Sequence, residues 1–204
     1  MRETILNKAT ELFLDLGFKS VTMDDIATEM GISKKTIYTH FKNKSVLVIA
    51  STEILFLRIC SGIDGVRKEN QNPIVELYSI KQYVMKHMKN QNSSAQFQLQ
   101  KYYPAVFAEM RSKQYDYMQD CVVENLNKGL EMGLYRENLD VEFASRIYFL
   151  GMVGIKDNDM FPADQFPMIT LMEKYLEYHL RGIVTQKGLK KLTETIENYT
   201  PNDL

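Results

Sequence analysis

The sequence predicts an all-α fold of about nine to ten helices. Over most of the chain, apolar residues recur every three or four positions, which is the spacing of one face of a helix. No segment shows the strict alternation of apolar and polar residues that is typical of a half-buried strand. The five prolines and ten glycines in 204 residues also leave long uninterrupted stretches in which helices can form.

The first two expected helices are set by local signals. Residues 5–16 carry apolar side chains at helical spacing, and Gly17 closes this helix. Thr22 can cap the next helix, because its hydroxyl can accept a hydrogen bond from the backbone of Asp25, three residues on. Asp25 stands where a reciprocal capping box usually has Glu or Gln. Gly31 then supplies a sharp turn.

A third helix is expected over residues 34–40, with Ser33 as its cap. Ile37 and Phe41 form its inner face. Its outer face is basic and hydroxyl-rich: Lys34, Lys35, Thr36, Tyr38 and His40. Between residues 30 and 52 there are four lysines and no acid, whereas the whole chain has a net charge of −1. Two short helices joined by a glycine turn, the second one basic, indicate a helix-turn-helix that faces nucleic acid. The alternative is a solvated helix with lysines on its free face.

The rest of the chain is divided into longer helices. Asn-Gln-Asn-Pro over residues 70–73 breaks one helix, and residues 90–93 form a polar loop. Pro104 suits the first position of a helix, where its missing N–H costs nothing, and Gly133 ends that helix. Asp140 can cap the next helix. These helices are expected over residues 43–69, 73 or 74 to 89, 94–101, 104–132, 141–156, 163 or 164 to 185, and in a short terminal segment ending near 198.

The run Gly-Ile-Ser-Lys-Lys-Thr-Ile-Tyr-Thr-His-Phe-Lys-Asn-Lys over residues 31–44 resembles the recognition helix and the start of the fourth helix of the TetR family of transcriptional regulators. The helix over residues 5–16, closed by Gly17-Phe18, resembles the first helix of that family. The resemblance is specific over the first quarter of the chain. It implies a three-helix helix-turn-helix DNA-binding domain over residues 1–44 and a helical effector-binding and dimerisation domain over residues 45–204.

Eight residues are expected to contact DNA by their positions in the resembling motif. Candidates for base edges are Lys34, Lys35 and Thr36. Candidates for phosphate contacts are Thr22, Tyr38, His40 and Lys44. Ser33, at the cap of the recognition helix, completes the set.

Aromatic and sulfur-containing side chains gather over residues 97–121, with further members over residues 78–88. Such side chains could line an apolar pocket that has a few hydroxyl groups. The expected ligand-binding residues are Tyr78, Phe97, Tyr103, Phe107, Tyr117, Met118 and Cys121. Each of them singly also fits ordinary core packing, and the pocket itself is implied by the family resemblance. Since Lys and Arg are sparse over residues 97–121, we expect a small apolar or aromatic effector.

The helices over residues 141–156 and 163–185 look suited to close packing. Small residues lie along the first of them: Ala144, Gly151 and Gly154. An apolar stripe lies along the second: Ile169, Met172, Leu176, Leu180 and Ile183. In the family, such a pair meets its copy across a two-fold axis as a four-helix bundle, which implies a homodimer with two DNA-reading heads. The alternative is that both sets of residues face the core of their own subunit.

Composition argues against several other classes of protein. A hydrophobic content of 45% and a charged content of 25% describe a soluble globular protein. We find no N-terminal signal segment and no run of the ~20 apolar residues that a membrane span needs, so we expect a cytoplasmic protein that does not bind a membrane. Cys60 and Cys121 have neither metal-ligand nor redox spacing. The three histidines are scattered and no catalytic constellation stands out, so we expect no enzyme activity, metal site or cofactor.

The sequence therefore predicts a ligand-responsive transcriptional regulator, most simply a repressor that a small effector releases from a palindromic double-stranded DNA operator. The competing hypothesis is a helical small-molecule-binding protein without DNA regulation. A helical enzyme is a third and weaker alternative. The intact basic face over residues 34–44 argues against the second hypothesis, and the lack of a catalytic constellation argues against the third.

Overall fold

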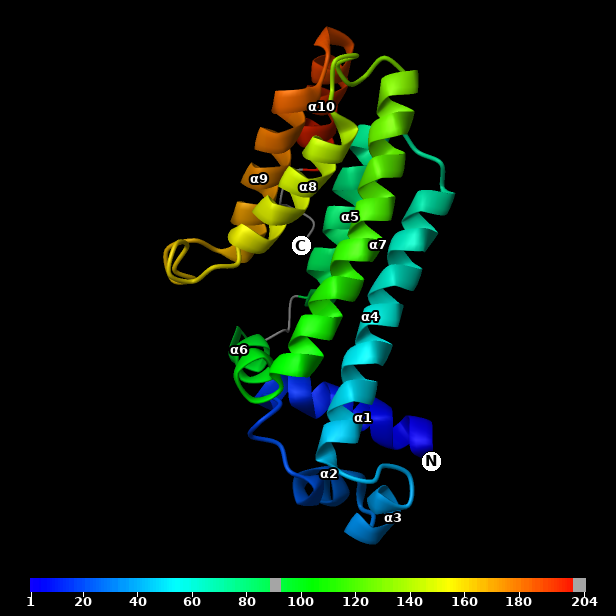
Figure 1. The fold of residues 1–204 in the computed structure, drawn as a ribbon, viewed down its shortest axis with the longest axis vertical. Helices are drawn as coiled ribbons and strands as arrows, with labels where there is room; N and C mark the ends of the chain where they lie inside the picture. The colour runs from blue at the N-terminus through cyan, green and yellow to red at the C-terminus, as the bar shows by residue number, and fades with distance from the viewer. Residues whose placement is uncertain (89–92, 200–204) are drawn as a thin grey trace. The chain divides into compact units, whose positions relative to one another are not determined.

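The computed structural model describes residues 1–88 and 93–199, and this part of the chain is helical without strands, as expected (Figure 1). One isolated antiparallel bridge joins Tyr135 and Val184. The described residues form ten helices: α1 (Arg2–Leu16), α2 (Met23–Met30), α3 (Lys34–Tyr38), α4 (Lys44–Lys68), α5 (Pro73–Met88), α6 (Ser93–Tyr102), α7 (Pro104–Glu131), α8 (Val141–Gly154), α9 (Met168–Ile183) and α10 (Gln186–Asn198).

Most helix ends lie within two residues of the expected positions, and the start of α9 is the exception. The expectation that this helix begins at residue 163 or 164 is wrong, because α9 begins at Met168. Pro167 precedes it, and a proline disfavours the helical conformation of the residue before it. The N–H groups of Gln165 and Phe166 both bond to the Pro162 carbonyl, at 3.0 and 2.9 Å, so this segment is a turn. The polar loop expected over residues 90–93 lies mostly outside the described residues.

The chain divides into two compact units. The first unit contains residues 1–61 and 87–114, and the second contains residues 62–86 and 115–204. The helices α4 and α7 each contribute residues to both units. The expected boundary between a domain over residues 1–44 and one over residues 45–204 concerns function, and it stays a prediction.

The core of the first unit holds the short helices in place. Figure 1 shows α1, α2 and α3 around the first turns of α4. Buried side chains from five helices meet in this core, among them Ile5, Phe13, Ile26, Ile37, Leu47, Ala95 and Leu99. Burial of a large aliphatic side chain stabilises a fold by about 1.5–3 kcal/mol. The five-residue α3 is too short to be stable alone, so it depends on the burial of Ile37 in this core.

The core of the second unit contains a buried polar network beside its apolar residues. The amide of Asn125 donates to Glu76 at 2.8 Å and to the Pro73 carbonyl at 2.9 Å. The Tyr135 hydroxyl donates to the carbonyl oxygen of the Asn125 side chain at 3.0 Å. These paired groups fix α5 against α7, because each of them would be costly to bury without a partner.

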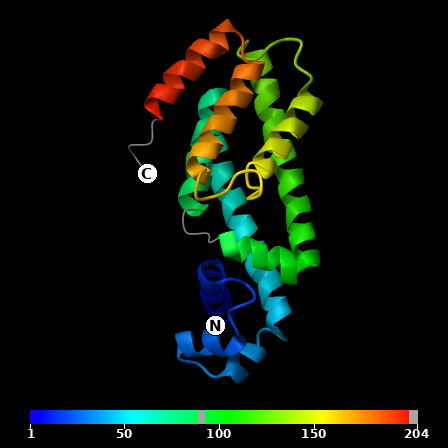
Figure 2. The same ribbon diagram turned by 90° about the vertical axis from the view of Figure 1, so that its left-hand side faces the viewer.

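The apolar stripe on α9 faces the core of its own subunit. Figures 1 and 2 show α8 and α9 side by side. Met172, Leu176, Leu180 and Ile183 are all at most 6% exposed within the single chain. The expectation that these four residues meet a second copy is therefore wrong, and for them the alternative holds. Periodicity identifies the apolar face of a helix without indicating whether its own chain or a partner covers it.

His179 is buried on α9. The rings of Tyr148 and Tyr175 lie beside it, with centroids 4.9 and 6.2 Å from the imidazole. Burial lowers the pKa of His179 to about 4, so the imidazole is neutral at physiological pH.

Among the described helices, α4 alone is long and apolar enough to cross a membrane by length and composition. Core helices of soluble proteins pass the same test. Leu47 and Val48 of α4 are fully buried in the first unit, and 28% of the apolar window of α4 is buried within the structure.

The two small residues near the end of α8 should respond differently to enlargement. A Cβ at Gly151 would overlap the ring of Tyr175, whereas a Cβ at Gly154 meets open space. Tyr175 cannot easily move, because its hydroxyl donates to the carbonyls of Ile147 and Tyr148 at 2.9 and 3.0 Å. Gly151→Ala should lower the free energy of unfolding by roughly 1–3 kcal/mol. Gly154→Ala, the control, should leave it unchanged or raise it by up to about 1 kcal/mol. Urea denaturation measures both, and equal effects would contradict the assigned packing.

Candidate nucleic-acid interface

The start of α2 is fixed by a complete capping box. The Thr22 hydroxyl accepts the Asp25 N–H at 3.2 Å, and the Asp25 carboxylate accepts the Thr22 N–H at 2.8 Å. The backbone N–H of Thr22, followed by its hydroxyl, holds the pKa of the Asp25 carboxyl below its ordinary value. An N-cap of this kind is worth about 1 kcal/mol to a helix. Asp thus performs the reciprocal role that Glu or Gln usually has.

The turn between α2 and α3 depends on Gly31. This residue has φ of 63° and ψ of 30°, the left-handed conformation that glycine adopts at little cost. Its N–H bonds back to the Thr28 carbonyl at 3.1 Å. The chain can therefore leave α2 and begin α3 within a few residues, as a helix-turn-helix requires.

The inner and outer faces expected for α3 are confirmed by burial. The Ser33 hydroxyl accepts the Thr36 N–H at 3.1 Å and caps the helix. Ile37 is fully buried and Phe41 is 1% exposed. On the other side of the helix, Lys34, Lys35, Tyr38 and His40 are exposed, and Thr36 is half-buried. α3 ends at Tyr38, two residues before the expected end.

Two of the expected DNA-contacting lysines have partners within the first unit. The Lys34 ammonium lies 2.7 Å from the Asp24 carboxylate of α2, which raises the pKa of Lys34. Lys34 would have to exchange this exposed ion pair for a base edge. The Lys44 ammonium donates to the Lys19 carbonyl at 2.9 Å, and burial lowers the pKa of Lys44. Lys44 is therefore a structural link within the unit as well as a candidate phosphate contact.

Sequence reasoning missed Asp24 and Lys19 as members of this site. Asp24 is ten residues from Lys34, and Lys19 is 25 residues from Lys44. Neither spacing corresponds to a local motif, so no sequence signal connected these pairs. The roles of the eight residues in DNA contact stay predictions.

The seven expected ligand-binding residues belong to different units. Phe97, Tyr103 and Phe107 lie in the first unit, where Phe97 is 59% exposed and the other two pack against the core. The second unit contains the remaining four, which are Tyr78, Tyr117, Met118 and Cys121.

The four residues have different surroundings in the second unit, where Cys121 is buried and burial raises the pKa of its thiol. Tyr78 and Met118 belong to or pack against its core. Tyr117 donates to Asp64 at 2.8 Å, and burial raises the pKa of the Tyr117 hydroxyl. The expectation that all seven residues line one cavity stays a prediction.

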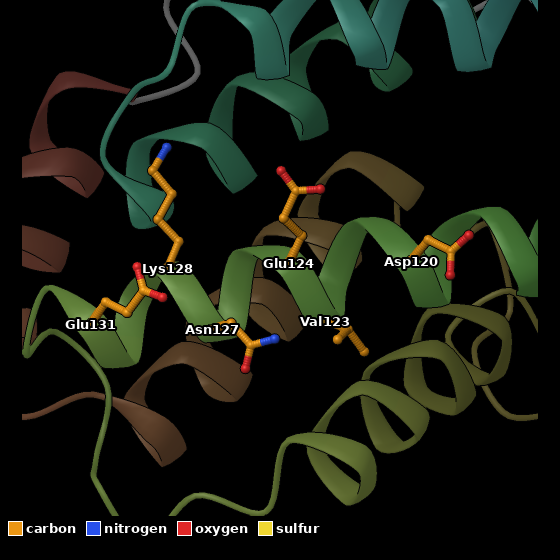
Figure 3. A pocket seen from close by; sticks show the side chains of 6 residues that line it. All are labelled: Asp120, Val123, Glu124, Asn127, Lys128 and Glu131. Atoms are coloured by element: carbon orange, nitrogen blue, oxygen red, sulfur yellow. The ribbon is translucent and has the colours of Figure 1, made fainter.

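Two hollows in the structure are lined by other residues. The larger, of about 400 Å³, lies along α7 and is lined by Asp120, Val123, Glu124, Asn127, Lys128 and Glu131 (Figure 3). Figure 3 shows the Lys128 and Glu124 side chains leaving α7 on the same side. The smaller, of about 80 Å³, lies between α4 and α7 in the first unit and has Phe56, Val106 and Met110 among its walls. Among residues 1–88 and 93–199, no group of three or more His, Cys, Asp or Glu could hold a metal ion.

The helix-turn-helix lies within a part of the chain that is similar to known proteins. Residues 5–50 match the family described as bacterial regulatory proteins, tetR family. The class C tetracycline repressor protein of Escherichia coli is 35% identical over 54 residues, which are 26% of this chain and 25% of that protein. The uncharacterised HTH-type transcriptional regulator YdeS of Bacillus subtilis is 26% identical over 174 residues, which are 79% of this chain and 84% of that protein.

Solved structures share the fold over most of the chain. The crystal structure of a transcriptional regulator from Cytophaga hutchinsonii aligns with a TM-score of 0.74 at 17% identity, over 90% of this chain and 98% of that chain. The chain spans less than a third of the length of the first curated relatives it matches. Residues 5–50 thus resemble bacterial regulatory proteins of the tetR family, and the structural similarity shows a shared fold over most of the chain.

Proposed function

We propose that this protein is a ligand-responsive, cytoplasmic transcriptional regulator that binds a palindromic DNA operator as a homodimer and acts as a repressor. The observation that supports this most strongly is the geometry of α3. Its apolar side is buried in the first unit, and its exposed side carries Lys34, Lys35 and Tyr38. Caps at Thr22 and Ser33 and the turn at Gly31 set this orientation.

DNA binding follows from the chemistry of that exposed side. Lysines and hydroxyl groups can donate hydrogen bonds to acceptors on base edges and to phosphate oxygens. We assign base contacts to Lys34, Lys35 and Thr36. The assigned phosphate contacts are Thr22, Tyr38, His40 and Lys44. Ser33, at the cap of α3, completes the proposed DNA-binding set. Because phosphate contacts release counterions, binding should weaken steeply as salt rises.

A second copy of the chain is the proposed partner of α8. Phe143, Ile147 and Leu150 lie on one face of this helix at helical spacing and are 63, 42 and 58% exposed. A row of large apolar side chains in water favours association. A two-fold dimer would place two recognition helices about 34–36 Å apart, over successive major grooves of a palindrome. Relatives in the family support a dimer because they are typically dimeric.

The proposed effector is a small apolar or aromatic molecule bound in the helices that follow residue 44. The aromatic and sulfur-containing residues over 78–121 support this class of ligand. An effector can release DNA only if it binds the DNA-free conformation more tightly than the DNA-bound conformation. A shift from mostly bound to mostly free requires a difference of several kcal/mol between these affinities, roughly 5.5 kcal/mol for a change from 1:99 to 99:1. The long α4, which begins beside α3 in sequence, is the proposed lever.

The exposed lysines of α3 should determine specific DNA binding. Replacing both Lys34 and Lys35 with alanine should weaken binding to a duplex selected by the wild-type protein by roughly tenfold or more, since one base contact is worth about 1–3 kcal/mol. The control variant, Lys174→Ala with Lys190→Ala, removes the same charge from exposed positions of α9 and α10 and should bind as the wild type does. Fluorescence anisotropy at several salt concentrations measures both. A folded double variant of α3 with unchanged affinity would favour the competing function, small-molecule binding without DNA regulation.

The exposed row on α8 should determine the mass in solution. Ile147→Glu with Leu150→Glu should convert a dimer into a monomer at micromolar concentration, because two charges would be buried without partners. Leu57→Glu is the matched control, since Leu57 is as exposed as Leu150 at 58% but lies on α4. Sedimentation equilibrium gives the masses. A wild-type protein that is monomeric without DNA would refute the proposed dimer.

A further inference from the structure

A side chain on α6 holds the corner between α1 and α2, defined here as residues 17–20. The Gln98 side-chain oxygen accepts the N–H of Lys19 at 2.7 Å and the N–H of Ser20 at 3.2 Å. The Gln98 side-chain nitrogen donates to the Ser20 hydroxyl at 3.4 Å. One side chain therefore binds the corner through three hydrogen bonds, although it is nearly 80 residues away in sequence.

The backbone conformation of the corner and the space at Gly17 both accommodate the Gln98 side chain. Gly17 has φ of 94°, in the region that favours glycine. A Cβ at Gly17 would overlap the amide group of Gln98. Both the backbone conformation and the space available therefore require glycine at this position, and the space is occupied by Gln98.

Gln98 is itself firmly placed. Ala95, one turn before it, and Leu99, the next residue, are 2 and 3% exposed and belong to the core of the first unit. The corner is also held from α4, because the Lys44 ammonium donates to the Lys19 carbonyl at 2.9 Å. The Lys19 backbone is thus fixed on its N–H side by α6 and on its carbonyl side by α4.

The corner leads directly into the helix-turn-helix. Thr22, two residues after it, caps α2, and α2 is followed by Gly31 and α3. A displacement of residues 17–20 would change the direction in which α2 starts, and α3 would move with α2. We propose that Gln98 is a positioning residue for operator recognition, which acts by fixing the corner over residues 17–20. This inference rests on the proposed DNA-binding function and adds to it a residue outside the helix-turn-helix.

A positioning role and a purely structural role predict different effects on DNA binding. Base contacts on two half-sites require that the recognition helices keep their placement. Non-specific binding depends mainly on phosphate charges and tolerates small displacements. Loss of positioning should therefore reduce the ratio of specific to non-specific affinity. A loss of fold stability alone would weaken both affinities in proportion and leave that ratio unchanged.

The test compares three substitutions on α6. Gln98→Met keeps the length of the side chain and removes the acceptor, whereas Gln98→Glu keeps the acceptor. Gln100→Met is the matched control, since Gln100 is an exposed glutamine on the same helix. The probes are a duplex that the wild-type protein selects from a random-sequence library and a scrambled duplex of the same composition. The ratio of the two affinities is measured at one salt concentration, and thermal unfolding is recorded for each variant.

Gln98→Met should lower the affinity ratio on the order of tenfold, since net losses of about 1.4 kcal/mol correspond to one decade. Gln98→Glu and Gln100→Met should both keep the affinity ratio within about threefold of the wild-type value. A threefold change corresponds to less than half of the free-energy loss expected for Gln98→Met. If the methionine variant does not fold, Gln98→Ala, which leaves the corner solvated, is measured instead.

If the wild type selects a duplex and Gln98→Met keeps the wild-type ratio of specific to non-specific affinity, this inference is wrong. The proposed function would then still stand. A Gln98→Glu variant that loses the ratio as fully as Gln98→Met would also overturn it. A wild-type protein that selects no duplex would overturn the proposed function, and this inference with it.

Discussion

The five-residue α3 cannot hold its own conformation, and this constraint governs the first unit of the structure. A helix of one to two turns gains too few backbone hydrogen bonds to offset the entropy of ordering its residues. α3 is helical because Ser33 caps it and because Ile37 and Phe41 are buried in the core. The same anchoring directs Lys34, Lys35 and Tyr38 outward. Fold stability and presentation of the proposed DNA-reading face therefore depend on the same two apolar side chains.

The core that anchors α3 is assembled from segments distant in sequence. α1, α2 and α4 supply most of its walls, and α6 adds Ala95 and Leu99 from beyond residue 90. Gln98 lies between these two buried residues and reaches the corner at residues 17–20. A segment that follows the proposed DNA-binding domain in sequence thus belongs to the same compact unit. In a regulator, such a segment brings α6, a helix that follows residue 44, into direct contact with the core that holds the helix-turn-helix.

Local signals in the sequence predicted much of the fold and of the reading face. The caps at Thr22, Ser33 and Asp140 and the turn at Gly31 all have the expected hydrogen bonds or backbone conformation. Each of these signals acts within three or four residues, which is why a single sequence reveals it. The start of α9 was missed because Pro167 outweighed a helical pattern of apolar residues.

Contacts between distant segments were not predictable in this way. The contacts of Gln98 with the corner and of Lys34 with Asp24 join residues without any regular spacing. The stripe on α9 was recognised, but its periodicity could not indicate that its own subunit covers it. The seven aromatic, Met and Cys residues expected to bind the effector pose the same difficulty, since core packing and pocket lining require the same types of side chain.

Every role proposed for this protein depends on contact between the exposed side of α3 and DNA. Chemical acetylation of lysines, followed by mass spectrometry with and without a selected duplex, tests this most directly. We expect the duplex to protect Lys34 and Lys35 strongly, while Lys174 and Lys190, which are exposed in the second unit, should be acetylated equally in both samples. Equal acetylation of Lys34 and Lys35 with and without bound DNA would contradict the account.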